Sequence, residues 1–221
     1  MRVVIAGGHG KIALRLERLL SSDGDQVVAL IRNPDHVADV EAAGAEAVVI
    51  DLENASVDDV ASVVRSADAV VFAAGAGPGS GAARKDTVDR GAAALLADAA
   101  EAAGVDRYVM VSAIGVDKEP PAGTDPVYAA YLRAKKAADD DLRSRKLAWT
   151  IIRPGGLTDE PGTGRVALDV EVERGSVPRD DVAEVVLAAL RRPFTAGLTL
   201  ELVEGTVPIV LALTDAAGDR D

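Results

Sequence analysis

The chain has no cysteine, only two histidines and few aromatic residues, and each of these shortages excludes a kind of chemistry. Without cysteine there is no disulfide, no thiolate metal site and no cysteine nucleophile. Two histidines are too few for a histidine-rich metal cluster, so we predict no metal site. Aromatic residues make up 3% of the 221 residues, so aliphatic side chains must form most of the core.

Basic residues are also outnumbered, with 24 lysines and arginines against 36 aspartates and glutamates and a formal net charge of −12. Such a chain repels nucleic-acid phosphates and anionic lipids, so neither is a predicted partner. No apolar run approaches the roughly 18 residues that span a bilayer. No secretion signal precedes the first predicted strand. We therefore expect a cytoplasmic protein, a monomer or homodimer, whose partner is a small-molecule substrate.

Short apolar runs alternate with longer segments of helical periodicity along the chain. The predicted strands cover 3–6, 27–31, 47–50, 69–74, 107–111, 148–152 and 198–203. The predicted helices cover 12–20, 34–44, 56–66, 85–103, 127–145 and 178–191. Because the strands are continuous apolar runs, both of their faces are expected to be buried, as in a parallel sheet between helices.

This alternation predicts one α/β domain over residues 1–221, a Rossmann-type doubly wound parallel sheet with helices on both faces. Residues 153–180 are expected to contribute a small C-terminal substrate lobe, because the pattern loosens there. The end of the chain from Thr214 is small and polar and is expected to fray. Ligands of such sheets bind at the carboxyl ends of the strands, so the residues that follow each strand are the candidate site.

A glycine cluster follows the first predicted strand, with the spacing Gly7-x-x-Gly10-x-x-Ala13. Glycines allow a tight turn and a close approach of a pyrophosphate, while the next helix points its N–H groups at the anion. A Gly-x4-Gly-Lys-Ser/Thr loop is excluded, because no serine or threonine follows Lys11. A plain glycine turn remains the alternative. The predicted cofactor-binding residues here are Gly7, Gly8, His9, Gly10, Lys11 and Ile12.

Arg32 and Asn33 follow the second predicted strand. An acidic residue at this place would bind a ribose 2′-hydroxyl and select NAD, whereas an arginine can pair with the 2′-phosphate of NADP. We therefore predict NADP(H) as the cofactor and both residues as part of its site. A solvated surface arginine is the alternative interpretation.

The next three strand ends supply the rest of the predicted dinucleotide site. Asp51 can accept a hydrogen bond from an adenine amino group while Leu52 packs against the ring, and a helix-capping aspartate is the alternative. After the fourth strand, small residues let the ribose and phosphate lie against the backbone. These residues are Ala73, Ala74 and Gly75. Ser112 follows the fifth strand and is expected to face the nicotinamide.

Tyr131 and Lys135 are four residues apart on a predicted helix and therefore share a face. An ammonium near a phenol favours the phenolate and lowers its pKa. A tyrosine tuned in this way can exchange a proton with a carbonyl oxygen while hydride moves at the carbon. The alternative is an amphipathic tyrosine beside a solvated lysine. Tyr128 has Leu132 at the corresponding position and lacks the lysine partner.

Taken together, these segments resemble the short-chain dehydrogenase/reductase superfamily in its atypical NAD(P)-binding branch. That branch includes NmrA-like regulators, flavin and biliverdin reductases, and nucleotide-sugar epimerases. The segments that carry the resemblance are 7–13, 32–34, 108–112, 131–135 and 152–155, in the family's order.

The resemblance implies roles for the candidate catalytic residues. Tyr131 would be the acid/base, and Lys135 would lower its pKa and hold the nicotinamide ribose. Ser112 would bind the substrate oxygen. Asp89 stands where the family has an asparagine, and a carboxylate cannot donate as an amide does, so the usual proton relay is altered.

The resemblance also places Arg153, Pro154 and Gly155 beside the nicotinamide, with the loop to Thr163 lining the substrate pocket. The implied function is an NADP-dependent oxidoreductase acting on a small carbonyl or alcohol. The alternatives are a non-catalytic NADP-binding sensor of redox state and an NAD(P)-dependent epimerase or dehydratase. The stretch 156–178 is short for a large sugar-nucleotide site.

Overall fold

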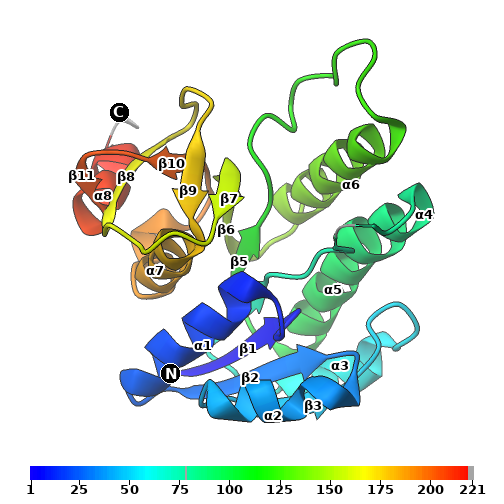
Figure 1. Cartoon of the computed structure of the whole chain (residues 1–221). Coiled ribbons are helices and arrows are strands. Elements are labelled where there is room, and N and C mark those ends of the chain that lie inside the picture. The colour runs from blue at the N-terminus through cyan, green and yellow to red at the C-terminus, as the bar shows by residue number, and fades with distance from the viewer. Residues whose placement is uncertain (78, 219–221) are drawn as a thin grey trace.

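The computed structural model describes residues 1–77 and 79–218. Within these residues the main sheet has nine strands in the order β11-β8-β10-β6-β5-β4-β1-β2-β3 (Figure 1). The strands are β1 (Arg2–Ala6), β2 (Gln26–Ile31), β3 (Glu46–Val49), β4 (Ala69–Phe72), β5 (Arg107–Val111), β6 (Ala148–Pro154), β8 (Arg165–Asp169), β10 (Leu198–Glu204) and β11 (Val207–Pro208). All pairs from β3 to β10 are parallel, whereas β8 runs antiparallel to both of its neighbours. A separate parallel pair joins β7 (Gly156–Thr158) to β9 (Ser176–Pro178).

Helices cover both faces of the sheet (Figure 1). The α-helices are α1 (Lys11–Ser22), α2 (Val37–Ala42), α3 (Val57–Val64), α4 (Ala82–Arg84), α5 (Ala93–Ala103), α6 (Pro126–Arg143), α7 (Arg179–Leu190) and α8 (Ile209–Gly218). A π-helix, η2 (Lys85–Ala92), joins α4 to α5, and short 3-10 helices form η1 (Pro34–His36) and η3 (Pro193–Thr195). Among the described residues, no helix is long and apolar enough to cross a membrane.

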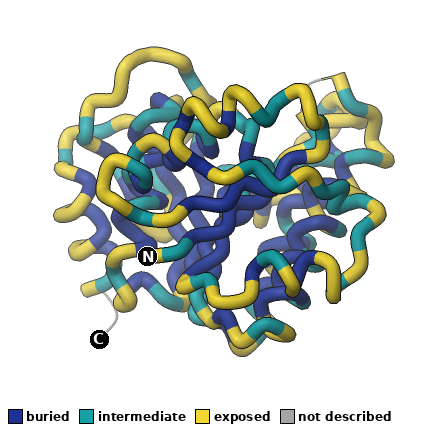
Figure 2. The backbone as a smooth tube through the Cα atoms, turned by 90° about the horizontal axis from the view of Figure 1, so that it is seen from below, coloured by how far each residue is buried: buried dark blue, intermediate teal, exposed yellow. Residues whose placement is uncertain are grey.

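The sheet separates two hydrophobic cores. One lies under α1, α7 and α8 and contains Leu16, Val182 and Leu213, and the other lies under α3, α5 and α6. Alternate residues of β1 enter opposite cores: Ile5 packs in the first and Val4 in the second. The central strands are therefore buried from both sides (Figure 2), which explains their continuous apolar runs.

The predicted fold class is confirmed: the sheet is mostly parallel, doubly wound and covered on both faces. The single helix expected over 85–103 is instead the π-helix η2 followed by α5. The β8 strand was missed because it alternates buried and exposed residues, unlike the central strands. The prediction of a frayed end from Thr214 is wrong through Gly218, because α8 buries Leu213 and Ala216; residues 219–221 lie outside the described part.

Candidate functional site

Two cavities of about 420 Å³ and about 790 Å³ lie at the carboxyl ends of the parallel strands. Both are lined by His9, Gly10 and the segment 73–77, so they are parts of one continuous cleft. The smaller cavity extends over the ends of β2 and β3, and the larger one reaches the end of β5 and the start of α6. This is the place where open parallel sheets bind their ligands.

The glycine loop is shaped by close approaches of backbone to backbone. Gly7 has a φ of 80°, and a Cβ there would lie 2.5 Å from the Cα of Ala74. Gly10 forms the N-cap of α1, its N–H donates to the Gly7 carbonyl at 2.8 Å, and it lines both cavities. The start of α1 therefore faces the cleft, with its first N–H groups free of helical partners.

The other loop residues divide between the cleft and the core. Lys11 and Ile12 line the larger cavity. Gly8 lines neither cavity, because it packs on β2, where its Cβ would lie 2.5 Å from the Cβ of Ala29. The assignment of Gly8 to the cofactor is therefore not supported by its position, and a packing requirement explains this glycine.

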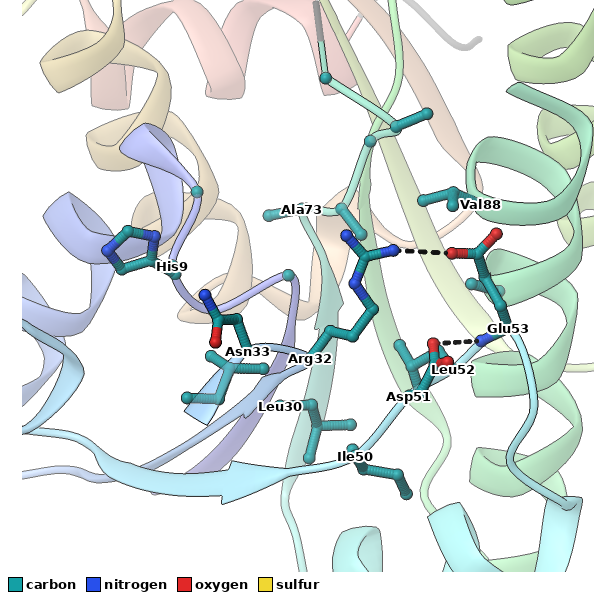
Figure 3. A pocket seen from close by; sticks show the side chains of 18 of the residues that line it. His9, Leu30, Arg32, Asn33, Ile50, Asp51, Leu52, Glu53, Ala73 and Val88 are labelled. Atoms are coloured by element: carbon teal, nitrogen blue, oxygen red, sulfur yellow. Dashed lines mark hydrogen bonds and ion pairs between the residues drawn. The ribbon is translucent and has the colours of Figure 1, made fainter. Parts of the chain in front are cut away.

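Arg32 crosses the smaller cavity to a carboxylate that the sequence did not point to (Figure 3). Its Nη1 lies 3.0 Å from Oε2 of Glu53, and the same oxygen accepts from Nη2 of Arg84 at 2.7 Å. Thr87 donates to the other Glu53 oxygen at 2.7 Å. The hydrogen bond from Arg84 is the largest of the causes that hold the pKa of Glu53 below its usual range. Arg32 and Arg84 thus share one carboxylate, that of Glu53.

Asp51 and Leu52 both line the smaller cavity (Figure 3). The carboxylate of Asp51 accepts from the backbone N–H of Glu53 at 3.1 Å and from the Asn54 side chain at 2.7 Å. It therefore stabilises the turn after β3, which is close to the capping alternative, although the N-cap of α3 itself is Ser56.

Two histidine rings stack at the edge of the smaller cavity. The centroids of His9 and His36 are 3.5 Å apart, and His9 Nε2 lies 2.8 Å from an Asp39 oxygen. Asn33 also lines this cavity, and its side chain accepts from the N–H of Asp35 to begin η1. His36 was not predicted, since it lies five residues beyond the end of β2.

All four residues predicted to be catalytic line the larger cavity: Ser112, Tyr131, Lys135 and Asp89. Lys135 and Asp89 are 4% and 0% exposed, and their charged atoms lie 3.4 Å apart. Lys135 Nζ also donates to the carbonyl oxygen of Val111 at 3.1 Å. The aspartate that replaces the family's asparagine is therefore the counter-ion of the buried lysine.

This ion pair changes the electrostatics expected at Tyr131. Burial raises the pKa of the Tyr131 phenol, and the Asp89 carboxylate raises it further. The pKa is thus raised and not lowered as expected from Lys135, first because the phenol is buried and then because Asp89 lies nearby. The phenol is therefore protonated at neutral pH.

Arg153 points away from the cleft towards α6, contrary to expectation. Its Nε lies 2.8 Å from Asp139 on α6, and its Nη1 binds Asp117 in the loop after β5. Burial raises the pKa of Asp139, and the neighbouring Arg153 and Ser112 offset part of that rise. Arg153 thus anchors the helix that carries Tyr131.

Pro154 and Gly155 line neither cavity. Pro154 is buried in β6, and a Cβ on Gly155 would lie 2.3 Å from the carbonyl oxygen of Gly175. Thr163 binds the buried Asp181 through its N–H instead of lining the cleft. Pro154, Gly155 and Thr163 therefore pack against other parts of the protein, which the motif could not reveal.

Several residues of the cleft were missed. Those in the larger cavity include Lys85, Tyr128, Leu157 and Arg179, and those in the smaller include His36, Glu53 and Arg84. The spacing of Lys85 and Asp89, four residues apart, was a usable signal. Tyr128 stacks on Tyr131 with ring centroids 5.9 Å apart, so it belongs to the site although it lacks a lysine partner. Leu157 was not singled out, but it lies in the loop to Thr163 that was expected to line the substrate pocket; nothing in the sequence marked Arg179.

A parallel sheet whose glycine loop and helix start border such a cleft defines the class of α/β dinucleotide-binding proteins. Within that class, the profile of the NAD(P)H-binding family matches residues 7–193, and the chain belongs to this family. This agrees with the atypical short-chain dehydrogenase/reductase branch that its motifs resemble.

Individual relatives cover nearly the whole chain. A Bacillus subtilis protein named "Uncharacterized sugar epimerase YhfK" is 39% identical, over 96% of this chain and 99% of its own. A Bacillus halodurans structure, whose name places it among NAD-dependent epimerases and dehydratases, has a TM-score of 0.89 at 34% identity and covers 97% and 99%. The oxidoreductase ylbE of Lactococcus lactis has a TM-score of 0.87 at 28% identity and covers 100% and 99%. The chain is thus an NAD(P)-binding protein of an oxidoreductase- and epimerase-like family.

Proposed function

We propose that this protein is an NADP-dependent oxidoreductase that acts on a small carbonyl or alcohol substrate. The observation that carries the proposal is the gathering of Tyr131, Lys135, Asp89 and Ser112 in a cavity continuous with the glycine loop. The loop fits a dinucleotide, since Gly7 allows a tight turn against the Ala74 backbone and Gly10 begins α1 at the wall of both cavities. A nicotinamide bound there supplies or accepts the hydride.

Within this proposal, Tyr131 donates a proton to the substrate oxygen. Its raised pKa keeps the phenol protonated, which suits reduction of a carbonyl better than oxidation of an alcohol. Lys135, fixed by Asp89 and by the Val111 carbonyl, is rigid enough to hold the nicotinamide ribose. Ser112 lines the same cavity and is proposed to bind the substrate oxygen, for which its buried hydroxyl must turn from Asp139 towards the cavity.

The preference for NADP rests on Arg32 and Arg84, which meet at Glu53 in the smaller cavity. Two guanidinium groups can exchange part of their contact with Glu53 for a ribose 2′-phosphate. No acidic residue occupies the place directly after β2 that would bind a 2′-hydroxyl. In a thermal-shift assay at equal concentrations, NADPH should therefore raise the melting temperature more than NADH.

An epimerase or dehydratase is the second candidate, favoured by the names of the two Bacillus relatives. Such reactions begin by oxidising an alcohol, which requires Tyr131 to accept a proton. The stretch 156–178 is short for the site of a large sugar nucleotide. We therefore place reduction first.

Replacing Tyr131 tests the proposal directly. Tyr131→Phe should lower NADPH-dependent turnover of an aromatic aldehyde by at least about 100-fold, the scale of general acid catalysis, and leave NADPH affinity nearly unchanged. The matched control is Tyr128→Phe, the neighbouring ring in the same cavity, which should keep most of the turnover. Full activity of Tyr131→Phe would remove this residue from the role of acid.

We also propose a cytoplasmic protein that acts as a monomer or homodimer without nucleic acid. Its support is the net charge of −12, which disfavours polyanions. Gel filtration and a nucleic-acid shift assay test these points.

A further inference from the structure

The larger cavity carries more positive than negative charge, although the whole chain has a net charge of −12. Its lining has four ammonium or guanidinium groups against two carboxylates; they are Lys11, Lys85, Lys135 and Arg179, with Asp89 and Asp125. Such a local reversal of sign attracts anions.

Three of the four cations already have carboxylate partners. Lys135 pairs with Asp89 at 3.4 Å. Lys11 and Arg179 both contact Asp159, at 2.5 Å and 2.9 Å. Lys11 also begins α1, where the diphosphate of a dinucleotide is expected, so its charge belongs to the cofactor half of the cleft.

Lys85 is different. It is 9% exposed, its Nζ donates to the carbonyl oxygen of Gly77 at 2.9 Å, and it lies 5.4 Å from the centroid of the Tyr131 ring. Among the described residues, it has no carboxylate within ion-pair distance. Burying an ammonium without a counter-charge is costly, so this position favours an anion that comes from outside the chain.

The segment that carries Lys85 also points to a functional position. The π-helix η2 begins at Lys85 and places both Lys85 and Asp89 against the larger cavity. π-Helices are rare and are found frequently at functional sites.

The rim beside Lys85 is apolar and open. Val127, Tyr128 and Leu157 line the cavity and remain 36%, 53% and 39% exposed. Tyr128 stacks on Tyr131, so its ring presents a flat surface next to the ring that Lys85 faces. Asp125 cannot serve as the missing counter-ion, since its carboxylate caps α6 through the N–H groups of Val127 and Tyr128.

We propose that Lys85 binds an anionic group of the substrate, a carboxylate, while the flat apolar body of the substrate lies against Tyr128 and Leu157. The substrate class is therefore an aromatic or similarly flat carboxylic acid that bears the reducible carbonyl. This inference rests on the proposed function to the extent that the larger cavity is the substrate site. It assigns Lys85 to substrate affinity and not to proton transfer.

Two probes that share a naphthalene ring, one with a carboxylate and one with a neutral hydroxymethyl group, test the site without turnover. 1-Naphthoate and 1-naphthylmethanol are titrated calorimetrically into the full chain, alone and saturated with NADP+. Naphthoate should bind at least about 10-fold more tightly than the alcohol, because it adds a charge-assisted bond. Lys85→Met should abolish this difference, Lys85→Arg should keep most of it, and NADP+ affinity should stay unchanged in both.

The matched control is Lys118→Met, an exposed lysine paired with Glu171 outside the cleft, which should leave the naphthoate preference intact. Equal affinity of the wild type for the two probes, or an undiminished preference in Lys85→Met, overturns the proposal. The first of these outcomes needs no variant to fold.

If naphthoate binding depends on Lys85 but Tyr131→Phe stays active, the proposed catalysis fails and the anion site stands. If Tyr131→Phe is inactive and the preference is absent, the anion site fails alone.

Discussion

The two halves of the cleft recognise their ligands by different means. The smaller cavity is lined mainly by segments that directly follow β1 to β4, with Arg84 of α4 and two residues of η2 beside them. Its charges are balanced, with Arg32 and Arg84 against Asp51 and Glu53. The larger cavity takes side chains from η2, β5, α6, β7 and α7 and has an excess of positive charge. The first suits a ligand common to a whole family, and the second suits a substrate particular to this chain.

The difference also concerns how tightly each half is constrained. In the dinucleotide half, backbone touches backbone, so a single methyl group is excluded at Gly7. In the substrate half, exposed side chains such as Tyr128 form the wall and can change without disturbing the fold. A family can therefore keep its cofactor and change its substrate.

The strongest test of this contrast is Gly7→Ala. The new Cβ would meet the Ala74 backbone at 2.5 Å with φ at 80°, so we expect NADPH affinity to fall by at least about 100-fold, about 3 kcal/mol. Gly24→Ala is the control, because φ is 81° but nothing lies within 4 Å. It should cost about 1 kcal/mol of stability and leave binding intact. Fluorescence titration of NADPH measures both, and near-normal binding by Gly7→Ala would contradict the contrast.

The next prediction concerns a carboxyl group that is buried outside both cavities. Glu17 on α1 is fully buried beneath the glycine loop, where a Cβ on Gly8 would lie 3.2 Å from its Oε1. Burial raises the pKa of Glu17 to about 8. The folded state thus holds a proton that the unfolded chain releases above about pH 4.5, so stability falls as pH rises from about 5 to 8.

Glu17→Gln removes this titration. Relative to the wild type, the variant should gain about 1 to 4 kcal/mol in unfolding free energy between pH 5 and pH 8. Urea unfolding at both pH values measures the gain, with the exposed Glu41→Gln as control. Parallel pH dependences for wild type and Glu17→Gln would show that Glu17 does not carry the buried proton.

The smallest effect probes the charge balance of the smaller cavity. Glu53→Gln frees Arg32 and Arg84 from their shared carboxylate, so NADPH affinity should rise about 3- to 10-fold while NADH affinity changes little. Arg32→Leu should lower NADPH affinity by a similar factor. Equal changes in affinity for NADPH and NADH would show that these arginines do not bind the 2′-phosphate.

Most of the fold could be predicted because its signals are local. The central strands are short apolar runs, and the turns after them contain the glycines and small residues that a parallel sheet requires. The π-helix was not predicted: Lys85–Ala92 is more polar than the alanine-rich α5, but nothing in its sequence distinguishes the hydrogen bonding of a π-helix from that of an α-helix. Strand β8 packs on α8 and β10, and α8 packs on β8 and α7, so their burial depends on segments from different parts of the chain.

The candidate site shows the same division. Tyr131 and Lys135 share a helix face by spacing alone, so their common cavity could be expected. The electrostatic environment of these two residues could not be expected, because it depends on Asp89, which lies 46 residues before Lys135 in the chain.

By itself, the sequence determined that this protein is an α/β dinucleotide-binding protein, because its glycine loop and the other candidate cofactor residues lie directly after the strands. Only the tertiary structure decided which charges remain free. It paired Lys135 with Asp89 and Arg32 with Glu53, and it left Lys85 in the cavity with no carboxylate partner among residues 1–77 and 79–218. Electrostatic partners are chosen by distance in space, and that distance is set when elements far apart in the chain pack together.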